Sequence, residues 1–105
     1  MGRAMEFKVI WSQRAVSDLE ELCGYIAGDN PTAALQTGRG ILEHVKLLAA
    51  FPFIGPNYPR ESHGDIREII YRPYRIFYAV KEADQTVDIL HVRHGARREP
   101  KLQLP

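Results

Sequence analysis

Residues 67–80 read REIIYRPYRIFYAV, a run that predicts two β-strands joined by a tight turn at Arg72-Pro73. Side chains alternate between the two faces of a strand, so positions 74, 76, 78 and 80 share one face and Arg75, Phe77 and Ala79 share the other. An arginine in the middle of an otherwise apolar sheet must reach water, a carboxylate or a phosphate, because a buried unpaired guanidinium is very costly. Arg75 therefore links the predicted fold to a candidate function.

Two helices are predicted upstream of this strand pair. Ser12 is a suitable N-cap for the first helix, whose apolar residues follow at helical spacing as far as Gly28. Asn30-Pro31 then begins the second helix, since proline is tolerated at the first helical position. Gly38 and Gly40 lie inside the second helix, where each costs about 1 kcal/mol relative to alanine. We expect close packing of a neighbouring element at these glycines.

The remaining segments predict an α+β fold. Residues 6–11 alternate as a strand, and residues 86–93 form the last strand after a polar turn. The connection over residues 51–65 is rich in proline and longer than most loops, and we expect its aromatic side chains to hold it to the core. The prediction is an N-terminal strand, an antiparallel helical hairpin and a three-stranded antiparallel meander, with the helices packed on one face of a curled sheet.

Composition indicates one cytoplasmic domain over residues 1–105, with residues 1–5 as a disordered segment or an alternative start. Hydrophobic residues make up 45% and charged residues 26%, and the net charge of +1 gives little support to nucleic-acid binding. The single cysteine, Cys23, excludes an intramolecular disulfide, and its apolar helical face favours a small core residue over a nucleophile. There is no apolar run of membrane-spanning length and no secretory signal pattern.

Two arginines on the paired strands are the first candidate site residues. Arg67 and Arg75 are both expected on or beside the open face of the sheet, where their guanidinium groups would bind RNA phosphates or the carboxylates of a protein partner. The alternative for each is a structural ion pair, for instance with Glu68, Glu6 or Asp88. The sequence leaves both interpretations open.

The end of the last strand supplies the other candidates. His91 and His94 have a spacing typical of a helical metal pair, but residues three apart in a strand point to opposite faces, so we expect no metal and no cofactor. His94 alone is a candidate proton donor or acceptor at neutral pH. Gly95 ends the strand and places Arg97 just beyond it, a position suited to binding.

Several motifs in order resemble the RelE/ParE superfamily of bacterial toxins from about residue 6 to residue 100. The motifs are Trp11-Ser12-Gln13-Arg14-Ala15, Tyr25-Ile26 before Asn30-Pro31, Phe51-Pro52 with Gly55, Arg67-Glu68, Tyr74-Arg75-Ile76-Phe77-Tyr78 and His94-Gly95-Ala96-Arg97. The resemblance implies the toxin of a type II toxin–antitoxin pair, also called a plasmid stabilisation protein. It implies a cognate antitoxin as partner, in a hetero-oligomer without membrane contact.

The resemblance leaves two mechanisms. RelE-like members are similar to ribosome-dependent mRNA endonucleases, and by this resemblance Arg75 or Arg97 would hold the scissile phosphate while His94 moves protons and Arg67 adds positive charge. The tail over residues 101–105 has no tyrosine or histidine of the kind that often ends such nucleases. ParE-like members resemble inhibitors of DNA gyrase, which need a binding surface alone. We expect a ParE-like inhibitor; an mRNA endoribonuclease, or a decayed toxin that binds only its antitoxin, are the alternatives.

Overall fold

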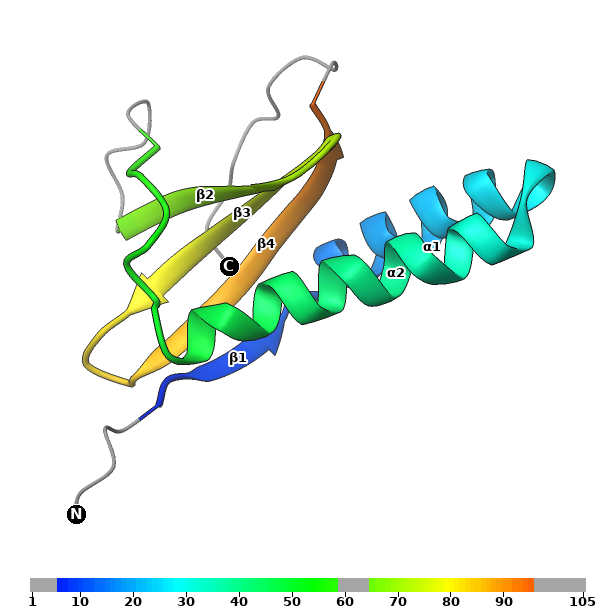
Figure 1. Ribbon diagram of the computed structural model, residues 1–105. Coiled ribbons are helices and arrows are strands. Elements are labelled where there is room, and N and C mark those ends of the chain that lie inside the picture. Colours follow the sequence, from blue (N-terminus) through cyan, green and yellow to red (C-terminus); the bar gives the residue numbers. More distant parts are fainter. Residues whose placement is uncertain (1–5, 59–64, 96–105) are drawn as a thin grey trace.

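The order of elements confirms the predicted α+β fold (Figure 1). The computed structural model describes residues 6–58 and 65–95. Along the chain lie β1 (Lys8–Trp11), α1 (Gln13–Asp29), α2 (Pro31–Lys46), the 3-10 turn η1 (Leu47–Ala49), β2 (Asp65–Tyr71), β3 (Tyr74–Lys81) and β4 (Thr86–His94).

The two helices form an antiparallel hairpin whose starts are fixed by side-chain caps. Ser12 Oγ accepts a hydrogen bond of 3.0 Å from the Ala15 N–H, and Asn30 Oδ1 accepts one of 3.0 Å from the Ala33 N–H. These caps satisfy backbone donors that have no partner inside a helix, which is why the helices begin where the sequence predicts. Figure 1 shows that the hairpin extends well beyond the sheet on the side where α1 turns into α2.

The sheet is mixed, with strand order β1-β4-β3-β2. The meander pairs antiparallel as predicted, while β1 lies parallel to β4 with Lys8 opposite Thr86 and Trp11 opposite Ile89. The Arg72-Pro73 peptide bond between β2 and β3 is cis. Since β1 ends opposite Ile89, no described strand pairs with the second half of β4 on that side, and the start of α1 lies there instead.

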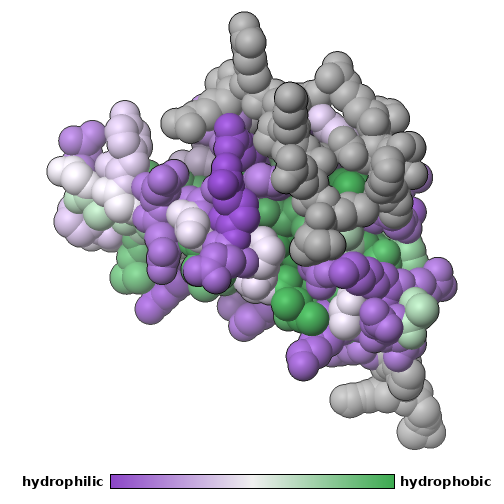
Figure 2. All heavy atoms as spheres, turned by 180° about the vertical axis from the view of Figure 1, so that it is seen from behind, coloured by the Kyte–Doolittle hydropathy of each residue, from purple (hydrophilic) through white to green (hydrophobic). Residues whose placement is uncertain are grey.

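The core has two parts, one on each side of the sheet. The larger part lies between the helices and the sheet and is made of Ala15, Ile41, Val45, Leu48, Ile76, Tyr78, Val80, Val87, Ile89 and Val92. The smaller part lies on the far face and is made of Tyr58, Ile66, Phe77, Ala79 and Leu90. Figure 2 views the molecule from behind and shows hydrophobic side chains across its middle, bordered by hydrophilic ones.

The alternation predicted for β3 is confirmed, since positions 76, 78 and 80 face the helices and positions 77 and 79 face away. Tyr58 holds the long connection to the far face as expected, whereas Phe51 in the same connection is exposed.

The predicted close packing at the helical glycines is confirmed, although the close neighbours are side chains. A Cβ atom at Gly40 would overlap the Tyr71 ring and hydroxyl, and one at Gly38 would lie 3.2 Å from Cys23 Sγ. Contacts this short are rare for real Cβ atoms, so Gly40 is needed for Tyr71 of β2 to lie against α2. Cys23 itself is partly buried, and burial raises the pKa of its thiol. Among the described helices, none combines the length and apolar character needed to cross a membrane.

Candidate functional site

Arg75 lies on the far face of the sheet in a two-point ion pair with Glu68. Its Nε and Nη2 donate to the two carboxylate oxygens at 2.5 and 3.2 Å, and its guanidinium carbon lies 5.0 Å from the centre of the Phe77 ring. Both charged side chains are less than one-fifth exposed. A forked pair of this kind fixes the direction of the guanidinium and neutralises much of its charge. The sequence left open whether Arg75 binds a partner or forms a structural ion pair, and the structure contains the ion pair with Glu68.

Arg93 of β4 lies directly opposite Arg75, and it was not among the site residues predicted from the sequence. Its Nε is buried and makes no hydrogen bond to any other described residue. Two arginines therefore lie opposite each other on adjacent strands, and Glu68 pairs with the guanidinium of Arg75. This pair, Arg75 and Arg93, is defined here as the arginine pair, and its chemistry suits an anionic partner group.

The register that creates the arginine pair depends on a bulge in β4. Tyr78 lies opposite Ile89 and Phe77 lies opposite His91, so Leu90 is an extra residue on the β4 side. Without this extra residue, continuation of the register from the preceding turn would place Val92 opposite Arg75. Bulges of this kind re-aim side chains and are common near functional sites.

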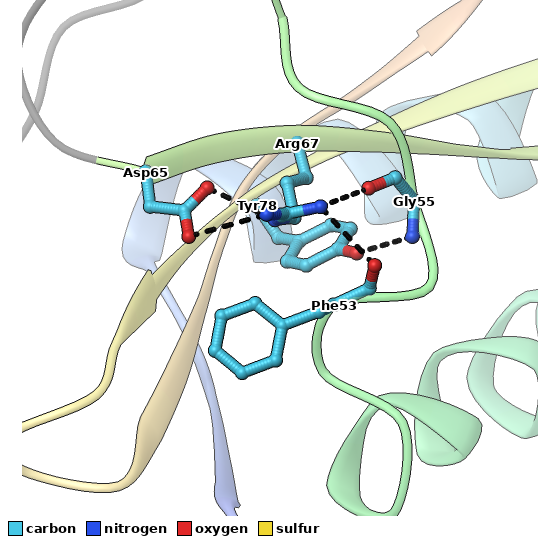
Figure 3. A network of polar contacts seen from close by, with 5 residues as sticks. All are labelled: Phe53, Gly55, Asp65, Arg67 and Tyr78. Atoms are coloured by element: carbon cyan, nitrogen blue, oxygen red, sulfur yellow. Dashed lines mark hydrogen bonds and ion pairs between the residues drawn. The ribbon is translucent and has the colours of Figure 1, made fainter.

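Arg67 lies on the other face of the sheet, so the expectation that it accompanies Arg75 on the open face is wrong. It is opposite Tyr78, a residue of the helix-side core, and Figure 3 shows its guanidinium between Asp65 and the main chain of the long connection. Nε donates to Asp65 at 2.9 Å, and Nη1 donates to the carbonyl oxygens of Phe53 at 3.1 Å and Gly55 at 2.7 Å. The guanidinium also lies 5.1 Å from the centre of the Phe53 ring.

Tyr78 of β3 also belongs to this network, because its hydroxyl contacts the main chain of the long connection (Figure 3). The Gly55 N–H donates to the Tyr78 hydroxyl at 3.0 Å, and the side chain of Tyr78 is fully buried. Burial raises the pKa of Tyr78, and the hydrogen bond from Gly55 and the positive charge of Arg67 oppose that rise. The network therefore fastens the connection to β2 and β3, which gives Arg67 a structural role.

His94 lies at the end of β4 on the helix side. It is opposite Tyr74, and the two rings meet edge to face with their centres 5.7 Å apart. Both rings line a cleft of about 430 Å³ between α1 and the ends of β3 and β4, to which α1 contributes Tyr25 and Leu22. Because Tyr74 and Arg75 are adjacent on one strand, their side chains and those opposite them emerge on different faces.

The three predicted site residues that the structure describes therefore do not form one cluster. Arg75 lies on the far face, Arg67 is on the helix side under the loop, and His94 is on the helix side near α1. Arg97 lies outside the described residues. A proton donor must be within hydrogen-bond reach of the reacting group, and His94 and Arg75 emerge on opposite faces of the sheet.

Side chains at the start of α1 form hydrogen bonds with the backbone of the half of β4 that does not pair with β1. Asp18 accepts a 3.0 Å hydrogen bond from the Val92 N–H, and its carboxylate lies 3.6 Å from His91 Nδ1. Ser12 Oγ donates to the Leu90 carbonyl at 3.3 Å. Within residues 6–58 and 65–95, no group of three histidine, cysteine or acidic side chains is placed to hold a metal ion. His91 is thus a buried residue beside a structural carboxylate.

The family model, the similar protein and the similar structures all come from type II toxin–antitoxin systems or their toxins. Residues 9–99 match the family model described as the ParE toxin of the type II toxin–antitoxin system parDE. The toxin RelE2 of Caulobacter vibrioides is 34% identical over 91 residues, which cover 86% of this chain and 97% of that toxin.

Solved structures agree with this match. A chain of the chromosomal ParDE system from P. aeruginosa superposes with a TM-score of 0.70 at 26% identity, covering 87% of this chain and 98% of that one. A chain of the RelBE2 toxin–antitoxin complex from Mycobacterium tuberculosis superposes with a TM-score of 0.57 at 26% identity, covering 85% and 98%.

Proposed function

The chain belongs to the ParE toxin family of type II toxin–antitoxin systems, and from that premise we propose that it acts by binding a target, DNA gyrase, without cutting RNA. One observation carries this proposal: the strand arginine that a nuclease would need for phosphate is already held at two points by Glu68. The predicted proton-transfer residue, His94, emerges on the opposite face. Binding requires neither a free guanidinium nor a proton relay.

The surface that we assign to the target is the arginine pair. Arg75 is held rigidly by Glu68, and Arg93 presents a guanidinium from the neighbouring strand. Rigid, pre-oriented arginines lose little side-chain entropy on binding and are frequent among residues that dominate interface energies. A carboxylate of the target is the kind of group that guanidinium forks of this pair would bind.

A cognate antitoxin is the second partner that we propose. The similar structures come from ParDE and RelBE systems, one of which is described as a toxin–antitoxin complex. We propose that the antitoxin neutralises this toxin in a hetero-oligomer, and that both act in the cytoplasm, where gyrase and ribosomes are found.

The test compares two activities of the purified chain. We expect inhibition of gyrase supercoiling and no cleavage of mRNA on translating ribosomes. Arg93→Ala should raise the concentration needed for half-inhibition about tenfold or more, because a hydrogen bond to a charged group contributes about 1.5–3 kcal/mol. Arg14→Ala, which removes a largely exposed arginine on α1, is the matched control and should change it less than twofold.

The outcomes separate the proposal from its alternatives. Ribosome-dependent mRNA cleavage without inhibition of gyrase would contradict it and establish the RelE-type activity, which the similarity to RelE2 keeps as the second candidate. If neither activity is found but an antitoxin binds tightly, the chain is a decayed toxin.

A further inference from the structure

The far face of the sheet carries more positive than negative charge in the described strands. Strand pairing and alternation place there the charged residues Lys8, Arg75, Lys81, Arg93, Glu68 and Asp88. Both of its acids are held by cations. Glu68 pairs with Arg75, and Asp88 Oδ2 lies 2.9 Å from Lys81 Nζ. The two carboxylates therefore decide how much positive charge this face presents to a partner.

The two ion pairs differ in the way each carboxylate holds its cation. Glu68 accepts from both Nε and Nη2 of Arg75, so it fills one whole edge of the guanidinium. Lys81 meets Asp88 through a single nitrogen and is 45% exposed, so its ammonium group keeps contact with water. A phosphate binds a guanidinium through the same kind of two-point contact as a carboxylate does. Glu68 therefore occupies the position that a phosphate would take on this edge of Arg75.

A nucleic acid and a protein would meet this arrangement differently. A nucleic-acid backbone carries a negative charge at every phosphate, and a carboxylate repels each phosphate that approaches it. A protein surface carries both signs of charge, so it can place a carboxylate at Arg93 and an N–H or ammonium donor at Glu68. Specificity often depends on a group that repels the wrong partner as well as on contacts with the right one.

We propose that Glu68 is a specificity-determining residue of the arginine pair, and that its charge keeps the phosphates of single-stranded RNA from binding there. The far face then contains a phosphodiester site that one carboxylate closes. The inference rests on the proposed function and deepens it, because it assigns to one residue the choice of a protein partner over RNA.

The test measures binding of a short, fluorescently labelled oligouridine to the purified full chain by anisotropy, at one fixed salt concentration. Glu68→Gln keeps the size of the side chain and removes its charge. It should bind the oligouridine about tenfold or more tightly than wild type, because a charged hydrogen bond to phosphate becomes available at Arg75. Glu68→Ala removes the carboxylate altogether and should show the same gain, and circular dichroism checks the fold of each variant.

Asp88→Asn is the matched control, because it removes the same charge from the same face but releases Lys81 instead of Arg75. It should change the affinity for the oligouridine less than threefold. Adding Arg75→Gln to Glu68→Gln should abolish the gain, since the proposed phosphate ligand is then absent.

Three results would overturn the assignment to Glu68. They are equal affinities of Glu68→Gln and Asp88→Asn, a gain that persists without Arg75, and binding by wild type as tight as that of Glu68→Gln. Inhibition of gyrase by wild type is measured separately. Failure of the proposed function would appear as unimpeded supercoiling, whereas failure of this inference would appear in the RNA affinities of the variants.

Discussion

Replacing Arg67 by alanine is expected to destabilise the folded state strongly. The guanidinium donates to the carbonyl oxygens of Phe53 and Gly55 and to the carboxylate of Asp65, and its side chain is only 18% exposed. Alanine leaves these acceptors without their donor and exposes the Phe53 ring that the guanidinium covers. The long connection would then lose its attachment to β2.

The magnitude follows from the number and kind of these bonds. A hydrogen bond involving a charged group contributes about 1.5–3 kcal/mol, and partial solvent access to Asp65 and Phe53 reduces the sum, so we expect a loss of about 2–4 kcal/mol. At a urea m-value of about 1.5 kcal/mol/M, the unfolding midpoint should fall by about 1.3–2.7 M. Arg67→Lys keeps the positive charge but loses the forked guanidinium, so its unfolding midpoint should lie between those of wild type and Arg67→Ala.

The control is an ion pair on the surface. Lys46 and Glu43 are 3.5 Å apart and both side chains are 73% exposed, so Lys46→Ala should change the free energy of unfolding by less than about 0.5 kcal/mol. If Arg67→Ala costs no more than this control, the structural role assigned to Arg67 is refuted.

Three further predictions concern stability. Gly55→Ala should lower the free energy of unfolding by about 2–3 kcal/mol in a urea titration, because its Cβ would overlap the Glu68 carbonyl oxygen beside buried groups. Asp18→Ala should lower it by about 1–3 kcal/mol in the same titration, since the Val92 N–H loses its acceptor, while Asp18→Asn should retain most of the stability. Burial raises the pKa of Tyr78 in the folded state, so the contribution of its neutral hydroxyl to the free energy of unfolding is complete below about pH 10 and is lost as the pH rises through the folded pKa. The difference in free energy of unfolding between wild type and Tyr78→Phe should therefore become smaller above about pH 10, when urea unfolding is measured at several pH values.

Local signals in the sequence predicted the elements of the fold well. The caps at Ser12 and Asn30 and the alternation in β3 depend on neighbouring residues, and each is present as expected. The pairing of β1 with β4 depends on residues far apart in the chain, and a strand of four residues carries no local signal for its partner. Its parallel position at the sheet edge was therefore not predictable in this way.

Two features of the site were missed from the sequence: the face on which Arg67 lies, which was predictable, and the position of Arg93, which was not. The two-residue turn places Tyr71 opposite Tyr74, and counting back from it puts Arg67 opposite Tyr78, on the helix side. That information was present in the sequence. The bulge at Leu90 was not, because nothing local distinguishes an extra residue in an apolar strand, and only the bulge places Arg93 opposite its partner arginine.

The parallel pairing of the first and last strands also sets the timing of folding during synthesis. Lys8 pairs with Thr86, so roughly 80 residues must follow β1 through the ribosome before its partner exists. At roughly 5–20 residues per second this takes roughly 4–16 s, during which β1 and the helical hairpin have no sheet to pack on. The nascent chain therefore cannot complete its sheet, with β1 at the edge, until nearly all of it has been translated.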